Sequence, residues 1–178
     1  MHPDVESILF SQQAIAERVA QLGKQLSQDF ADTRPLMVCI LKGSVMFYAD
    51  LLRAMSIPVE LDFMAISSYG AGAKSSGEVR LVKDLDTKIE GRRVVIVEDI
   101  IDAGYTLSYL KRMLASRGPA SVSICALLDK VSRRQVPVEV EYTGFECADE
   151  FVVGYGLDFA QRYRNLPYIG ILKREVYE

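Results

Sequence analysis

The sequence predicts an α/β protein whose mainly parallel, twisted sheet is flanked by helices. Several aliphatic runs of strand length, such as VVIV at 94–97, lack the polar alternation of a half-exposed strand, so we expect helices on both of their faces. Segments with helical periodicity separate these runs along the chain. Charged residues and glycines recur just after the runs, at the edge where open parallel sheets bind their ligands.

Three segments predict helices. The first covers 11–30, where Ser11 is the expected N-cap and apolar side chains recur on one face. The second follows the Lys-Gly-Ser stretch at 42–44. The third begins after Gly104 and ends at the Gly-Pro pair at 118–119, a sequence that commonly terminates helices.

Further segments predict strands, and together with the helices they complete one domain. These strands are expected at 35–41, 58–66, 79–85, 92–100, 121–130, 138–145, 150–156 and 168–176. No internal repeat or linker divides the chain, and 178 residues suit a single hydrophobic core. We therefore expect a single domain over 1–178, with a flexible Gly- and Ser-rich loop at about 67–78.

The composition excludes several classes of protein. A net charge of -3 and a pI of about 5.3 give no reason to expect nucleic acid as a partner. No apolar run approaches membrane length and the N-terminus lacks a signal-peptide pattern, so no membrane is expected. Cys39, Cys125 and Cys147 show no zinc-site spacing. A reducing, cytoplasmic location is the expectation.

The stretch VVIVEDIIDAGYTL at 94–107 carries the strongest functional signal. Free N–H groups and the helix dipole favour an anion in the turn before the third helix, and Gly104 lets a phosphate approach closely. Asp102 could instead simply cap that helix. Capping leaves Glu98 and Asp99 unexplained, since buried carboxylates are costly unless they bind hydroxyls, cations or a metal. Carboxylates beside a phosphate cradle indicate a sugar phosphate.

This stretch resembles the phosphoribosyl-pyrophosphate signature of the phosphoribosyltransferases: an apolar strand, Glu-Asp, two aliphatic residues, Asp and a Gly-containing loop. Other motifs are similar to the 6-oxopurine branch of that family, the hypoxanthine-guanine phosphoribosyltransferases. They are LKGSVMF, DFMAISSYG, SSGEVRLVKDLD, LLDK and DEFVVGYGLDFAQRYRNLPYIG, in this order. The resemblance covers nearly the whole chain from Ile8 onward.

The resemblance implies the type I phosphoribosyltransferase fold, with a small hood built from the N-terminal and C-terminal segments. It implies a purine salvage enzyme that transfers 5-phosphoribose from phosphoribosyl pyrophosphate to hypoxanthine and/or guanine, forming IMP or GMP and pyrophosphate. It also implies Mg²⁺ as cofactor and assembly as a homodimer or homotetramer. The loop at about 67–78 would close over the site and exclude water.

The resemblance also assigns roles at matching positions of the signature stretch. Glu98 and Asp99 would hold the ribose hydroxyls and, with Asp158, bind the metal. Asp102 would face N7 of the purine as general base or acid. The 5′-phosphate would lie on the loop that continues with Ala103, Gly104, Tyr105 and Thr106. Many family members have Thr or Ser at the position of Ala103, so one phosphate donor is missing here.

Further roles follow outside that stretch. Pyrophosphate would contact Lys42, Gly43, Ser68, Tyr69 and Arg164, and the peptide bond before Lys42 can be cis in this family. The purine would contact Lys130, Phe151, Val152 and Asp158. Lys130 would donate to the 6-oxygen, Phe151 would stack on the base, and Val152 would use its main chain.

Each of these residues also has an ordinary structural interpretation. Lys42 could be an ordinary solvated lysine, but the Leu-Lys-Gly context at a strand end favours a site residue. Without the resemblance, Phe151 and Val152 would be core residues and Asp158 a surface acid. Two other functions share the signature stretch. A pyrimidine or adenine phosphoribosyltransferase is disfavoured by LLDK and EFVVGYGLD, and an RNA-binding regulator of the same fold would need a more basic surface than the Arg133-Arg134 pair provides.

Overall fold

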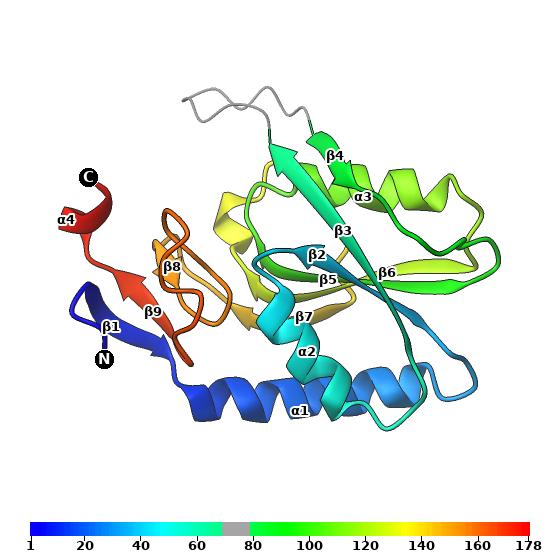
Figure 1. Cartoon of the computed structure of the whole chain (residues 1–178), viewed down its shortest axis with the longest axis horizontal. Helices are drawn as coiled ribbons and strands as arrows, with labels where there is room; N and C mark the ends of the chain where they lie inside the picture. Colours follow the sequence, from blue (N-terminus) through cyan, green and yellow to red (C-terminus); the bar gives the residue numbers. More distant parts are fainter. Residues whose placement is uncertain (69–78) are drawn as a thin grey trace.

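The structure, a computed structural model, describes residues 1–68 and 79–178. Its main sheet has six strands in the order β4-β3-β2-β5-β6-β7 (Figure 1). The strands are β2 (Leu36–Leu41), β3 (Glu60–Ser68), β4 (Val79–Lys83), β5 (Arg93–Ile101), β6 (Ser121–Asp129) and β7 (Tyr142–Glu146). All neighbours pair in parallel except β3 and β4, which are antiparallel. The predicted mainly parallel sheet is therefore confirmed.

Helices cover both faces of this sheet. On one face lie α1 (Gln12–Asp29) and α2 (Val45–Ala54), and on the other lies α3 (Tyr105–Ala115) (Figure 1). Side chains of the central strand β5 contribute to the core on both faces of the sheet. Val95 and Val97 pack with α1 and α2, whereas Val94 and Ile96 pack with α3. This two-sided burial explains why the strand has no polar alternation.

The predicted N-cap of α1 is confirmed, because the Ser11 hydroxyl accepts a hydrogen bond from the Ala14 amide at 3.1 Å. No helix among the described residues is long and apolar enough to cross a membrane.

A second, three-stranded sheet in the order β1-β9-β8 forms the small hood (Figure 1). It contains β1 (Val5–Phe10), β8 (Val152–Val153) and β9 (Ile169–Leu172), and the short helix α4 (Arg174–Tyr177) follows. The two ends of the chain meet here, since β1 pairs antiparallel with β9 and the Lys173 amide donates to the Asp4 carbonyl at 2.9 Å. Strand β1 was not among the predicted strands, because its partner lies at the opposite end of the sequence.

Several predicted strands are shorter than expected. The strand predicted at 168–176 ends at Leu172, because the chain turns into α4 at Arg174, and the strand predicted at 79–85 ends at Lys83. Two others are shorter for local reasons. The strand predicted at 138–145 begins only at Tyr142, because the Glu141 carboxylate accepts the Ile124 amide of β6 at 2.7 Å. The strand predicted at 150–156 is limited to Val152–Val153, because 154–156 have positive φ angles of 101°, 50° and 101°.

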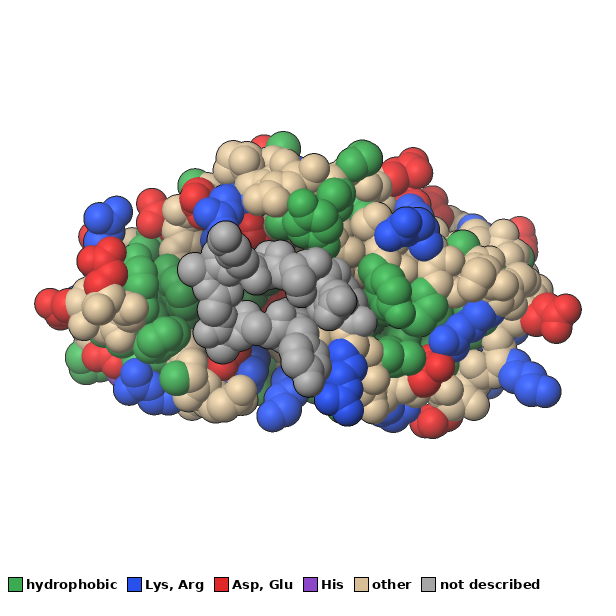
Figure 2. All heavy atoms as spheres, turned by 90° about the horizontal axis from the view of Figure 1, so that it is seen from above, with side chains coloured by type: hydrophobic (Ala, Val, Ile, Leu, Met, Phe, Trp, Pro, Cys, Tyr) green, Lys and Arg blue, Asp and Glu red, His purple; other side chains and the backbone are tan. Residues whose placement is uncertain are grey.

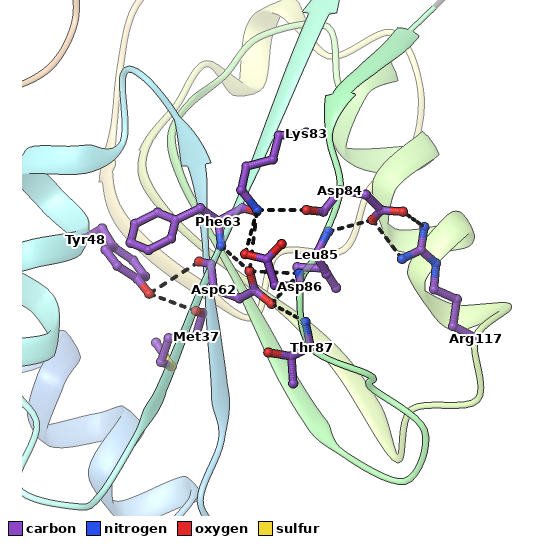
Figure 3. Close-up of polar contacts among 10 residues, drawn as sticks. All are labelled: Met37, Tyr48, Asp62, Phe63, Lys83, Asp84, Leu85, Asp86, Thr87 and Arg117. Carbon is purple, nitrogen blue, oxygen red and sulfur yellow. Dashed lines mark hydrogen bonds and ion pairs between the residues drawn. The ribbon is translucent and has the colours of Figure 1, made fainter.

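A buried carboxylate fastens the segment after β4 to the sheet (Figure 3). Asp62 on β3 accepts hydrogen bonds from the amides of Phe63 at 2.8 Å, Asp86 at 3.1 Å and Thr87 at 2.9 Å. Burial raises the pKa of Asp62, but the amide hydrogen bonds together outweigh burial and leave the pKa below its ordinary value. We call Asp62 and these three amides the Asp62 clamp.

Candidate active site

The Glu98-Asp99 pair lies near the carboxyl end of β5, inside the protein. Glu98 is 7% exposed, and its Oε1 accepts hydrogen bonds from the Ser44 hydroxyl at 3.3 Å and the Asp99 amide at 3.1 Å. Burial, then the charge of Asp99, raises the pKa of Glu98 well above its ordinary value. Burial also raises the pKa of Asp99, which hydrogen bonds with Glu98 and the Ile100 amide and, to a smaller extent, the charge of Arg164 partly offset. The protein therefore compensates the charged forms of these two carboxyl groups poorly.

The Lys42-Gly43 turn after β2 packs directly against this pair. The Leu41–Lys42 peptide bond is cis, as expected. A Cβ atom on Gly43 would lie 1.7 Å from Asp99 Oδ2, and one on Gly156 would lie 1.9 Å from the Gly43 carbonyl oxygen. Three backbone segments can meet here only because both positions are glycine.

The loop before α3 exposes the start of that helix. Gly104 is the N-cap with φ at 91°, and no side-chain hydrogen bond caps the helix in the described structure. Asp102 is thus not the helix cap, which removes the simpler interpretation of this residue. The Ala103 carbonyl accepts the amides of Gln135 at 3.0 Å and Val136 at 3.2 Å, so a neighbouring segment holds the loop. The amide donors of the first turn of α3 are not capped by a side chain in the described structure, which suits the predicted phosphate position.

The Asp102 side chain, half-exposed, is paired with a cation. Arg133 Nε donates to Asp102 Oδ1 at 3.0 Å, and Arg133 Nη1 donates to Asp149 Oδ2 at 3.3 Å. Asp149 in turn lies 3.8 Å from the Lys130 ammonium. Charges of alternating sign therefore connect the predicted general base with the predicted purine-binding lysine.

A cleft of about 270 Å³ brings most of the predicted base-binding residues together. Its lining consists of Asp99, Ile100, Asp102, Lys130, Phe151, Val152, Leu157 and Asp158. Lys130 is nearly buried, and its ammonium donates to the Glu150 carbonyl at 2.7 Å. An ammonium has three donors, so others remain for a ligand in the cleft. The cleft thus combines an aromatic ring, a cation and acids.

Phe151 is the aromatic element of this cleft. It is 37% exposed. One of its contacts is a parallel stack on Tyr177, with ring centroids 4.7 Å apart and an interplanar angle of 21°. Phe159 meets it edge-on, at 5.6 Å and 88°. Although Tyr177 and Phe159 pack against it, the Phe151 ring is partly exposed and can stack with a ligand.

Asp158 and Arg164 join the cleft to the Lys42-Gly43 turn. Asp158 Oδ1 pairs with Arg164 Nη2 at 2.8 Å, and Asp158 Oδ2 accepts the Gln161 amide at 2.8 Å. Arg164 Nη1 donates to the Gly156 carbonyl at 2.7 Å. Because Gly156 packs on Gly43, the Arg164 guanidinium is fixed beside the predicted pyrophosphate turn.

Comparisons with known proteins identify the family of this chain. The family model described as "Phosphoribosyl transferase domain" matches residues 6–160. The chain is 51% identical over 178 residues to a Bacillus subtilis protein named hypoxanthine-guanine phosphoribosyltransferase, covering 100% of this chain and 99% of that protein. It is 49% identical over 177 residues to a Streptococcus thermophilus protein of the same name, covering 99% and 98%. The chain belongs to the phosphoribosyltransferase family.

The fold comparison leads to the same family. A crystal structure of a hypoxanthine phosphoribosyltransferase from Staphylococcus aureus superposes with a TM-score of 0.96 at 46% identity, covering 100% of this chain and 97% of that one. The predicted phosphoribosyltransferase fold and family are thus confirmed.

Not every predicted site residue of this phosphoribosyltransferase reaches the cleft. Lys42 is exposed next to Gly43, and the Tyr105 hydroxyl donates to Gln135 Oε1 at 3.1 Å. Thr106 lies in the first turn of α3. Ser68 ends β3, while Tyr69 and the rest of the predicted loop through 78 lie outside the described residues.

The acids fit a magnesium ion only together with a substrate. No group of three or more His, Cys, Asp or Glu side chains within 1–68 and 79–178 is arranged to hold a metal. Mg²⁺ commonly uses one or two carboxylates and completes its shell with water and substrate phosphate oxygens. The undercompensated Glu98-Asp99 pair matches this donor set.

Other site residues escaped the sequence analysis. They are Ser44 beside Glu98, Ile100 and Leu157 in the cleft lining, Gly156 against Gly43, and Arg133 on Asp102. Ile100 and Ser44 adjoin predicted residues, so proximity in sequence could have suggested them. Arg133 and Gly156 reach the site only through tertiary packing, which the residue pattern does not encode locally.

Proposed function

We propose that this phosphoribosyltransferase transfers 5-phosphoribose from phosphoribosyl pyrophosphate to hypoxanthine and/or guanine, forming IMP or GMP and pyrophosphate. The observation that carries this proposal is the cleft in which Lys130, Asp102 and Phe151 come together beside the buried Glu98-Asp99 pair. The names of the relatives from Bacillus subtilis and Streptococcus thermophilus support it. The reaction belongs to purine salvage.

In this proposal the sugar phosphate lies along the end of β5 and the start of α3. Glu98 and Asp99 accept hydrogen bonds from the ribose hydroxyls, which supply donors that the protein itself does not. The 5′-phosphate binds the backbone amides from Ala103 to Thr106. Ala103 has no hydroxyl, so this loop relies on its amides and the Thr106 hydroxyl.

The purine occupies the cleft of about 270 Å³. It stacks on Phe151, and the main chain of Val152 contacts its edge. Lys130 donates to the 6-oxygen, which favours an oxopurine over adenine, since an amino group offers an ammonium no comparable acceptor. Asp102 accepts the proton from N7 as N9 of the base bonds to the sugar carbon and pyrophosphate leaves, so the base of the product carries no extra proton.

Pyrophosphate leaves along the opposite side of the sugar. Lys42, Gly43 and Arg164 receive it, with Ser68 and Tyr69 as further proposed contacts. Glu98, Asp99 and Asp158 do not form one metal-ligating group among the described residues, so they would hold Mg²⁺ together with water and substrate oxygens. The ion would stabilise the leaving pyrophosphate by neutralising its charge. The Asp158–Arg164 pair adjoins the same turn, so the acid and the cation act at one place.

The wider organisation is also a proposal. We infer a single domain over 1–178, with the loop at about 67–78 and a hood from both chain ends, assembled as a homodimer or homotetramer.

The three cysteines are free and buried, which suits a reducing, cytoplasmic location. On the face seen in Figure 2, acidic and basic side chains are intermixed around the grey residues, which is unlike a nucleic-acid-binding surface.

The proposed function is tested by pyrophosphate release with hypoxanthine, guanine, xanthine and adenine in turn, with and without Mg²⁺. We expect Mg²⁺-dependent turnover of at least hypoxanthine or guanine. Turnover of adenine alone would contradict the oxopurine assignment. Strong, salt-sensitive RNA binding without any purine turnover would favour a regulator of the same fold instead.

A further inference from the structure

We propose that Tyr177, the penultimate residue, is a positioning residue for the purine base, acting through Phe151. The inference rests on the proposed function, because it concerns how the base-stacking ring is held. Its basis is the parallel stack of the two rings, with centroids 4.7 Å apart and an interplanar angle of 21°. Stacked aromatic pairs at this separation are attractive beyond their buried area.

The two faces of the Phe151 ring have different neighbours. Phe151 lines the cleft together with Asp102 and Lys130, which directly follow β5 and β6 of the six-stranded sheet. Tyr177 is not one of the residues lining this cleft in the described structure, and α4 lies at the outer end of the hood, away from the six-stranded sheet (Figure 1). Tyr177 therefore backs the ring from outside, and the base would complete a three-layer stack.

The Phe151 ring needs such support because its surroundings leave it partly free. It is 37% exposed, and Phe159 touches it only edge-on, at 5.6 Å and 88°. An edge contact restrains one side of a ring but leaves its plane free to tilt. The parallel stack with Tyr177 fixes that plane, so a planar base meets a preorganised surface.

The position of Tyr177 is itself set by the hood. The Leu172 amide donates to the Phe151 carbonyl at 2.8 Å, which joins the two segments just before α4 begins. The Lys173 amide donates to the Asp4 carbonyl at 2.9 Å, which ties the same segment to the N-terminus. Val176 and Tyr177 then pack on the hood core of Val5, Val153, Tyr163 and Leu172. The segment that leads into α4 is thus anchored both to the backbone of Phe151 and to the N-terminal segment.

The experiment compares steady-state KM values for the purine and for phosphoribosyl pyrophosphate in the full chain. We expect Tyr177→Ala to raise the KM for the purine about threefold to tenfold, the effect of one lost aromatic stack. The KM for phosphoribosyl pyrophosphate should change less than about twofold. Tyr177→Phe keeps the ring and should restore the wild-type purine KM, since no hydrogen bond of the Tyr177 hydroxyl occurs among the described residues.

Two controls separate this role from a general loosening of the C-terminus. Val176→Ala removes hood packing next to Tyr177 and should leave the ratio of the two KM values unchanged. In a Phe151→Leu background, Tyr177→Ala should have no further effect on the purine KM, because the ring through which it acts is gone.

Several results would overturn the inference. They are an unchanged purine KM in Tyr177→Ala, an equal rise in both KM values, the same KM split in Val176→Ala, or a full effect in the Phe151→Leu background. If the unmodified chain turns over an oxopurine, these failures affect the role of Tyr177 alone. If it turns over no oxopurine, the proposed function fails and this inference fails with it.

Discussion

The Asp62 clamp and the Glu98-Asp99 pair place carboxylates inside the same sheet, yet the protein treats them in opposite ways. Asp62 is 3% exposed and Glu98 is 7% exposed, so both are shielded from water, but protein atoms surround Glu98 more completely. Amide hydrogen bonds outweigh burial at Asp62 and lower its pKa. At Glu98, burial and the neighbouring Asp99 charge prevail, and the pKa rises.

The difference lies in where the compensating donors come from. At the clamp (Figure 3), backbone amides from the segment after β4 supply the donors, so the folded chain satisfies the carboxylate by itself. At the pair, a serine hydroxyl and a few amides face two carboxylates. Asp62 therefore stabilises the fold. The Glu98-Asp99 pair obtains enough hydrogen-bond donors or positive charge only when a ligand supplies them.

The largest expected effect belongs to the site region. Asp102→Asn should lower kcat by about 10²- to 10⁴-fold, because the amide cannot exchange the N7 proton. The free energy of unfolding should change little, since Asp102 is exposed and its ion pair with Arg133 lies at the surface. Turnover that is unchanged across pH would remove Asp102 as the proton-transfer group.

The clamp should show the reverse pattern. Asp62→Asn should lower the free energy of unfolding by about 2–4 kcal/mol, because both carboxylate oxygens accept amide N–H groups and an Asn side chain has only one acceptor oxygen. Denaturant unfolding measures this loss. The KM values should stay close to those of the wild type, and a variant as stable as the wild type would contradict the clamp.

The corresponding acid-to-amide substitution in the Glu98-Asp99 pair should lower activity without lowering stability. Glu98→Gln should lower kcat/KM for phosphoribosyl pyrophosphate about 10- to 150-fold, the effect of one lost charge-assisted hydrogen bond. The free energy of unfolding should hold or rise, because the amide removes a poorly compensated buried charge. Kinetics and denaturant unfolding on one preparation test both parts, and a loss of stability comparable to that of Asp62→Asn would contradict them.

Acid should remove the stabilising contribution of the Asp62 clamp to the free energy of unfolding. The folded pKa of Asp62 is lower than its ordinary value of 3.8, so its stabilising contribution is fully present above that pH and is lost as pH falls through the folded pKa. The stability difference between the wild type and Asp62→Asn should therefore narrow below about pH 4. Unfolding free energies from pH 7 to pH 3 measure it, and a constant difference would exclude this linkage.

The smallest effect is expected beside the clamp. Arg117 donates to both oxygens of Asp84 at 2.8 Å, but the two side chains are 33% and 44% exposed. Arg117→Lys keeps the charge and loses the two-pronged geometry, so we expect a stability loss of at most about 1 kcal/mol that shrinks with added salt. A larger, salt-independent loss would mean that this pair is part of the clamp.

Sequence reasoning predicted this molecule well where function and burial leave a local pattern. The aliphatic run of β5 and the acids that follow it were readable in the sequence, because a strand covered on both faces cannot alternate. The roles of Glu98, Asp99 and Asp102 remain predictions that the geometry supports.

Tertiary contacts were not readable in this way. In the sequence, nothing distinguishes Asp62 from an exposed polar residue of a strand. The two amides after β4 that donate to it lie more than twenty positions away in the sequence. The approach of Gly156 to Gly43 and of Tyr177 to Phe151 likewise joins distant segments. Such contacts depend on how the hood docks, which local periodicity does not specify.

The contrast between the two regions is tested most directly by following their side-chain carboxyl NMR signals through an acid titration without ligands. Asp62→Asn and Glu98→Gln provide the assignments. We predict that Asp62 titrates below the ordinary range for aspartate and that Glu98 titrates well above the ordinary range for glutamate. Two ordinary pKa values, or the reverse order of shifts, would contradict the account.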